Sequence, residues 1–246
     1  MRVVLPPSET KRDGGVEGSV LGLSTLSFPS LTPQRTEAIA ALTRLSRNIS
    51  ASTAALGLGP TQRFEIDRNR AIRTASTMPA VDRYTGVLFE GLASESLDAD
   101  AHAWLGRHVV VHSALFGLVG AADAIPAYRL SHDSRVPGLA LRRHWARAIA
   151  LELAAVDGLV LDLRSEAYAH LGPRPEGAFY LRVVTDGPNG QKRALNHFNK
   201  KGKGEFVREL ALAGVEHETV ESLLEWAVSR GIRLANGKPG ELELTV

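Results

Sequence analysis

Two serines and two tyrosines occupy positions where they could bind an anion or exchange a proton. Ser113 and Ser165 each follow shortly after an apolar run, and Tyr128 and Tyr168 come after them. Serine and tyrosine hydroxyls can both donate and accept hydrogen bonds. Active sites of α/β proteins collect where a buried strand ends and a polar loop begins. We therefore expect these four side chains to face a polar cleft.

A second group of polar residues is predicted to join this cleft. A short strand over 2–5 leads into a loop that carries Ser8, Glu9 and Lys11. Arg129 can bind a carboxylate or a phosphate through two parallel hydrogen bonds. The competing interpretation is an exposed loop and a surface Arg–Asp pair. The predicted cleft residues are Ser8, Glu9, Tyr84, Ser113, Asp123, Tyr128, Ser165 and Tyr168.

The densest basic run of the chain opens a predicted helix that continues to Leu212. Lysines beside a helix N-terminus are unfavourable to its dipole, and a bound anion would offset that cost. An ordinary solvated lysine run is the alternative. The residues predicted to bind DNA or another anion are Lys11, Arg129, Lys200, Lys201, Lys203 and Arg208.

No catalytic residue can be assigned from spacing, because no histidine stands at a recognisable distance from either serine. The loop over 8–15 lacks the glycine spacing of a Walker loop or a dinucleotide fingerprint. The eight histidines are scattered and match no metal-binding motif. The sequence therefore predicts neither a metal site nor a cofactor.

A sheet is needed to bring the candidates together. The apolar runs at 108–111 and 159–163 predict buried strands, and an amphipathic helix over 139–156 lies between them. This order predicts a right-handed parallel crossover. Ser113 and Ser165 would then lie at neighbouring strand ends and open on the same side of the sheet.

The remaining pattern predicts an α/β fold, with a mixed sheet and helices on both sides. Gly86 and Gly91 interrupt a helical segment over 79–92 and indicate a bend or a close neighbour. Other helices are predicted over 32–49, 62–75, 98–107 and 219–229, and hairpins over 178–198 and 232–246. We expect one compact domain over residues 1–246 with a central positively charged cleft.

Composition sets broad limits on location and partners. The chain has 246 residues, 44% of them hydrophobic and 23% charged, which is ordinary for a soluble globular protein. It has no apolar run of the length that spans a membrane, and its first residues do not form a signal peptide. Because the chain has no cysteine, cytoplasmic residence is the default expectation. The net charge of +2 allows an anionic partner without demanding one.

Several motifs occur together in a family-specific order: PPSETK, RYTGVLFEGL, HSALFGLVGAADAIPAYRL, LDLRSEAY and FNKKGKG. With them the chain resembles the YaaA-like peroxide-stress-resistance family from Leu5 to about Leu212. Two departures stand out. Lys203 replaces an arginine that is common in the family's basic run, and Ser131-His132 replace an acidic residue after the Tyr-Arg-Leu unit.

The resemblance implies a cytoplasmic protein that limits free iron and oxidative DNA damage. It also implies sequence-tolerant binding of duplex or branched DNA in a positively charged cleft, and a helix-hairpin-helix element, for which the segment 104–120 is a candidate. The alternative is an enzyme that acts on a small anionic ligand, phosphorylated or nucleotide-like, in the same cleft. Direct iron binding is a third hypothesis, in which His108 and His112 share a strand face without a third ligand.

Overall fold

Strand β1 (Arg2–Leu5) lies in the middle of the main sheet of the computed structural model, which describes residues 1–186, 192–194 and 198–246. It pairs in parallel with β3 (Val109–Ser113) on one side and with β6 (Val160–Asp162) on the other. The last three residues of β1 are fully buried, as a central strand covered on both faces requires. This confirms the three short apolar runs as strands.

Further strands extend the sheet in both directions. The order among the described residues is β4-β3-β1-β6-β7-β10-β9, and β8 also pairs with β7. Strands β7 (Phe179–Asp186) and β10 (Glu241–Thr245) are parallel to β6, whereas β4 (Gly117–Gly120), β8 (Lys192–Ala194) and β9 (Leu234–Asn236) are antiparallel to their neighbours. Strands β2 (Met78–Pro79) and β5 (Ala124–Ile125) form a separate antiparallel pair.

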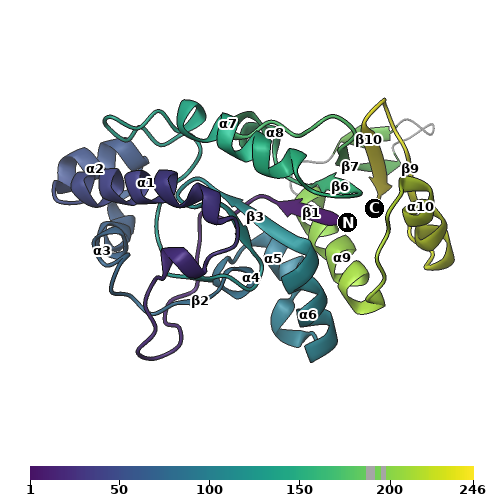
Figure 1. Ribbon diagram of the computed structural model, residues 1–246, viewed down its shortest axis with the longest axis horizontal. Helices are drawn as coiled ribbons and strands as arrows, with labels where there is room; N and C mark the ends of the chain where they lie inside the picture. Colours follow the sequence, from purple (N-terminus) through teal and green to yellow (C-terminus); the bar gives the residue numbers. More distant parts are fainter. Residues whose placement is uncertain (187–191, 195–197) are drawn as a thin grey trace.

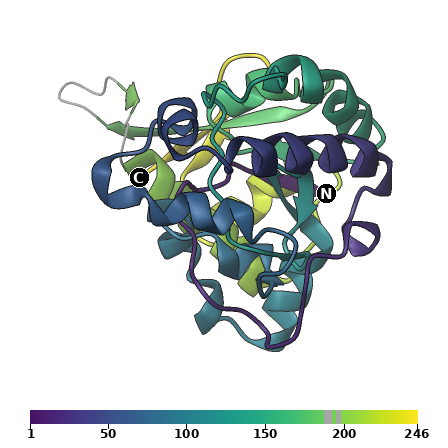
Figure 2. The ribbon, with the colours of Figure 1, turned by 90° about the vertical axis from the view of Figure 1, so that its left-hand side faces the viewer.

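Helices cover both faces of the sheet, with α7 and α8 on one side and α5, α6 and α9 on the other (Figure 1). Helix α1 lies alongside α7, as the turned view in Figure 2 also shows. This arrangement confirms the predicted α/β fold with a mixed sheet. The α-helices are α1 (Thr32–Leu45), α2 (Ile49–Leu56), α3 (Phe64–Arg70), α4 (Ala80–Arg83), α5 (Val87–Leu92), α6 (Ala99–His108), α7 (Leu141–Ala154), α8 (Glu166–Leu171), α9 (Phe198–Ala213) and α10 (Val220–Ser229). Short 3-10 turns span Leu23–Thr25, Pro29–Leu31, Pro60–Gln62 and Ser94–Ser96.

The crossover from β3 to β6 differs from the prediction in one respect. The two strands are parallel, as expected, but β1 lies between them. Ser113 and Ser165 are therefore not at neighbouring strand ends. The prediction failed because local sequence reveals that a strand is buried and does not reveal which strand pairs with it.

The segment 104–120 does not form the expected helix-hairpin-helix element. It contains the end of α6, then β3 and β4, which pair as a β-hairpin through Ser113↔Gly117. Gly117 adopts a φ of 68°, in the left-handed region that glycine tolerates. The predicted hairpin over 178–198 is present as β7 and β8, while its turn at 187–190 and the residues 195–197 lie outside the described residues.

Helices α5 and α9 approach each other through glycines. A Cβ atom on Gly91 would lie 2.6 Å from the Lys201 carbonyl oxygen, and one on Gly204 would overlap the Leu88 carbonyl oxygen. The segment 79–92 also breaks between α4 and α5, where Gly86 has a φ of 97°. Both the bend and the close neighbour that the glycines predicted are therefore present.

We expect Gly204→Ala to destabilise the fold by about 1–3 kcal/mol, because the added methyl group forces α5 and α9 apart. Gly106→Ala is the matched control. Its Cβ would meet Ala122 at an ordinary 3.6 Å, so the higher helix propensity of alanine should stabilise α6 by up to about 1 kcal/mol. Urea unfolding midpoints measure both changes, and equal effects of the two substitutions would contradict the packing argument.

Candidate functional site

A pocket of about 760 Å³ opens where β1 and β6 end. Residues from six parts of the chain meet there, because the parallel strands end on the same edge of the sheet. They are Pro6 to Thr10 after β1, Thr85 to Phe89 at the start of α5, Ser131 and His132, Leu163 with Ser165 to Tyr168 after β6, and Tyr180, Arg182, Asn199, Lys200 and Lys203 from β7 and α9. Of the predicted residues, Ser8, Glu9, Ser165, Tyr168, Lys200 and Lys203 line this pocket.

Lys203 forms a buried positive charge in the pocket wall, with 4% of its surface exposed. Its Nζ donates to the Leu163 carbonyl oxygen at 3.0 Å and lies 4.8 Å from the centroid of the Tyr180 ring. Burial lowers the pKa of Lys203 to about 8, because desolvation disfavours the charged amine. The amine is thus still mainly protonated at neutral pH and can attract an anion.

Two further cations lie near Lys203. Lys200 is exposed on the same helix. Arg182 extends from β7 and pairs with Glu241 through contacts of 2.7 and 3.0 Å. That hydrogen-bonded pair lowers the pKa of Glu241. Arg182 is therefore partly neutralised, and of these two cations Lys200 is the more exposed to a ligand.

Tyr168 and His132 form an aromatic wall on another side of the pocket. Their rings meet edge to face with centroids 5.3 Å apart, and Tyr168 also contacts the buried His112 at 5.7 Å. Arg164 donates to His112 Nδ1 at 2.9 Å and pairs with Asp162 at 2.7 Å. Since arginine only donates, His112 accepts at Nδ1, and burial followed by the charge of Arg164 holds its pKa well below the usual range.

Lys11 fixes the loop that follows β1 by hydrogen bonding to its backbone. Its Nζ donates to the carbonyl oxygens of Ser8 (2.8 Å) and Glu9 (3.1 Å) and lies 4.1 Å from the centroid of the Tyr128 ring. Burial lowers the pKa of Lys11 to about 7. Arg129 holds the other side of the loop through a 2.6 Å ion pair with Glu9. Neither Lys11 nor Arg129 lines the pocket. Both affect its shape by fixing the conformation of this loop.

Tyr84, Tyr128 and Ser113 form a buried hydroxyl chain behind the pocket. Tyr128 Oη lies 2.8 Å from Tyr84 Oη and 2.6 Å from Ser113 Oγ. Ser113 Oγ also accepts from the backbone N–H groups of Leu115 and Phe116. Burial raises the pKa of both tyrosines, so they stay neutral. These three predicted cleft residues therefore support the pocket without lining it.

Three other predicted residues lie apart from the pocket. Asp123 accepts from Ser27 and from the Gly120 N–H, which fixes the end of β4. Arg208 donates to the carbonyl oxygens of Leu92 and Ala93, where α5 ends. Lys201 is exposed and pairs with Glu205 at 3.5 Å, one helical turn later.

Sequence reasoning missed His132, Tyr180 and Arg182 as pocket residues. Tyr180 and Arg182 alternate along β7, so they share one face of the strand, which is the signal that could have indicated them. His132 stands in a polar loop with no periodic pattern. Only the departure from the family pattern at Ser131-His132 drew notice to that position.

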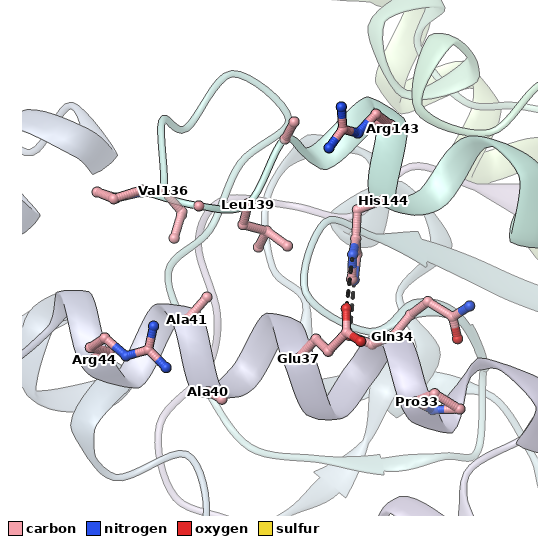
Figure 3. A pocket seen from close by; sticks show the side chains of 13 residues that line it. Pro33, Gln34, Glu37, Ala40, Ala41, Arg44, Val136, Leu139, Arg143 and His144 are labelled. Atoms are coloured by element: carbon pink, nitrogen blue, oxygen red, sulfur yellow. Dashed lines mark hydrogen bonds and ion pairs between the residues drawn. The ribbon is translucent and has the colours of Figure 1, made fainter.

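A larger and more open hollow of about 980 Å³ lies between α1 and the start of α7 (Figure 3). Glu37 of α1 points toward His144 of α7, at 3.7 Å between Oε2 and Nδ1. His144 Nε2 also contacts the Gln34 carbonyl oxygen at 2.9 Å. Arg44 and Arg143 border this hollow, but none of the predicted cleft residues reaches it.

Two findings on membranes and metals apply to the residues that the structure describes. None of their helices is long and apolar enough to cross a bilayer. No group of three or more histidine, aspartate or glutamate side chains among them could hold a metal ion. His108, one of the two histidines considered for iron, instead contacts the Met1 carbonyl oxygen and Glu216.

We expect stability to depend on pH through Lys11. Its folded pKa of about 7 is below its ordinary 10.5, so between these values the unfolded chain binds a proton that the folded chain has released. The stabilising contribution is complete above pH 10.5 and is lost as the pH falls through 7. The unfolding free energy of the wild type relative to Lys11→Met should thus rise between pH 7.5 and 9.5 by up to about 1.4 kcal/mol per pH unit.

Lys238→Met is the control for this measurement, because Lys238 is an exposed lysine in the turn between β9 and β10. It should leave the pH dependence of urea unfolding unchanged. Parallel stability curves for the wild type and Lys11→Met would show that the Lys11 amine does not titrate in this range.

Comparisons with known proteins agree with the motifs. The family model described as peroxide stress protein YaaA matches residues 1–231. A UPF0246 protein of Corynebacterium efficiens is 40% identical over 253 residues and covers 100% of both chains. UPF0246 proteins of Corynebacterium glutamicum strain R (39%, 94% of each chain) and Streptomyces coelicolor (38%, 100% of this chain and 98% of the relative) are similar over comparable lengths. With this coverage, the chain belongs to the YaaA family of peroxide stress proteins.

Proposed function

We propose that this peroxide stress protein binds DNA through the pocket and its basic rim, and that it limits free iron and oxidative DNA damage in the cytoplasm. One observation carries the DNA part: Lys200 and Lys203 reach the same pocket as Ser8 and Ser165, at the ends of β1 and β6. Cations and hydroxyls placed together in this way suit phosphate oxygens. The role in iron limitation is supported by membership of the family.

The positions of the basic residues narrow the set of phosphate contacts. Lys11 and Arg208 already donate to backbone carbonyl oxygens, and Arg129 is paired with Glu9. Lys200 and Lys201 are exposed on the first turn of α9. The 3.5 Å ion pair between Lys201 and Glu205 is itself exposed, so both lysines can follow a DNA backbone. We therefore assign phosphate contact to Lys200 and Lys201, with Lys203 as the fixed charge within the pocket.

The size of the pocket supports a second candidate function. A volume of about 760 Å³ falls within the range of small-molecule sites. An enzyme that acts on a small phosphorylated or nucleotide-like anion would use the same cations, with the loop that Lys11 holds as one wall. Such an activity would appear as turnover of a phosphorylated metabolite by the purified chain.

The DNA proposal is tested by measuring affinity for duplex and branched DNA against salt, using fluorescence anisotropy. Neutralised phosphates release counterions, so affinity should fall steeply between about 50 and 200 mM salt. Lys200→Ala should reduce the slope of log affinity against log salt by about 1. The effect should be the same for unrelated sequences, because phosphate contacts carry no sequence information.

Arg107→Ala is the matched control, since it also removes one exposed positive charge. Arg107 stands at the end of α6, just before β3 begins, on the edge of the sheet opposite the pocket. Its substitution should leave the salt slope unchanged. A flat salt response of the wild type, or no binding near 150 mM salt, would rule out DNA binding of this kind.

A further inference from the structure

The pocket has two chemically different ends, and the order of the strands separates them. Beside β7, the Lys203 amine and the Arg182 guanidinium lie 4.8 Å and 5.5 Å from the centroid of the Tyr180 ring. Toward β3, the rings of His132 and Tyr168 meet edge to face, and Tyr168 contacts His112 of β3. Strands β1 and β6 lie between these ends. A molecule that fills the pocket thus meets positive charge at one end and aromatic rings at the other.

The cationic end has hydrogen-bond donors available for a ligand. An ammonium group carries three N–H donors. Among the described residues, the Leu163 carbonyl oxygen accepts one hydrogen bond from Lys203. A buried charge is costly unless it is paired, and the oxygens of a phosphate would accept the other two donors. Lys200, exposed at the rim of the same pocket, supplies a second cation.

Aliphatic hydroxyl groups are also available to a ligand. Ser8, Thr10, Thr85 and Ser165 all line the pocket. Ser165 Oγ accepts a hydrogen bond from the Tyr168 N–H at the start of α8, which leaves the hydroxyl proton free to donate. Thr85 Oγ1 donates to Thr10 Oγ1 at 2.9 Å, so these two threonines join the wall of α5 to the loop after β1. Neutral donors of this kind suit a sugar or a phosphate ester oxygen.

We propose that the pocket binds one nucleoside monophosphate unit, with its phosphate at Lys203 and Lys200 and its base against His132 and Tyr168. The source is a free nucleotide or a nucleotide turned out of a DNA strand, and in the second case the inference rests on the proposed DNA binding. Aromatic side chains stack on any base, because every base has a π-face. The site is therefore tolerant of base identity and selective for the phosphate.

The first test titrates deoxyadenosine monophosphate, and separately inorganic phosphate, into the whole chain by calorimetry. Lys203→Met keeps the apolar stem and removes the charge, so it should weaken both ligands about tenfold or more. His132→Ala should weaken the nucleotide about fivefold or more and leave inorganic phosphate unchanged, since it removes only a stacking surface. Because His132 is only partly buried, this variant stays informative if Lys203→Met fails to fold.

Arg107→Ala is the matched control, because it removes an exposed positive charge on the opposite edge of the sheet and does not line the pocket. It should change neither affinity. Absence of nucleotide binding by the wild type at millimolar concentration would overturn the proposal. A His132→Ala variant that loses phosphate as strongly as nucleotide would overturn the assignment of the aromatic end.

A second arm distinguishes the two sources of the nucleotide. It compares a fully paired duplex with one that carries an adenine opposite an abasic site. If the nucleotide comes from DNA, the wild type should bind the second duplex at least fivefold more tightly, and His132→Ala should remove the preference. Binding of the free nucleotide without this preference assigns the pocket to free nucleotides.

These measurements can contradict either proposal without contradicting the other. Salt-sensitive DNA binding without nucleotide binding or an abasic-site preference would leave the proposed function standing and would overturn the pocket assignment. Nucleotide binding without affinity for DNA would overturn the proposed function and leave the pocket assignment standing.

Discussion

The close contact between α5 and α9 is the constraint on which the pocket depends. Gly91 and Gly204 let the two helices approach until no side chain fits at the crossing. The first turns of α9, with Lys200 and Lys203, then face the segment 85–89 across the pocket. Arg208 fastens the same contact by donating to the carbonyl oxygens where α5 ends, which are groups that a helix leaves unpaired. The two glycines therefore determine where Lys200 and Lys203 lie, although neither glycine would contact a ligand.

The buried lysines at the ends of β1 and β6 both donate hydrogen bonds to backbone carbonyl oxygens. Lys11 donates to the carbonyl oxygens of Ser8 and Glu9, and Lys203 donates to that of Leu163. Parallel strands end together, so carbonyl groups beyond their last ladder bonds collect on one edge of the sheet. The partial negative charge of those oxygens offsets part of the desolvation that lowers the pKa of both amines. The topology thus accounts for the burial of both lysines at this edge, where carbonyl oxygens can pair with them, because an unpaired buried charge is costly.

Short apolar runs and amphipathic periodicity were sufficient to predict β1, β3, β6, β7, α7 and α10, because each is determined by local burial. Strand pairing was not predictable in the same way, since no local pattern places β1 between β3 and β6. Composition also could not tell Lys203 from Lys201, which project from different sides of α9. Asp123 looked like a cleft residue, but its partner Ser27 is 96 positions away in sequence. His132 and Arg182 joined the site only through the tertiary fold.

The central position of β1 has a consequence for how the chain is made. Val3 pairs with Val109 and Arg2 with Val160, so both neighbours of β1 are synthesised long after it. Contacts of such high sequence separation slow folding. During translation the apolar strand leaves the ribosome with two open edges, and exposed segments of that kind are prone to aggregate. The nascent protein is therefore expected to be a substrate for ribosome-associated chaperones until its second half has emerged.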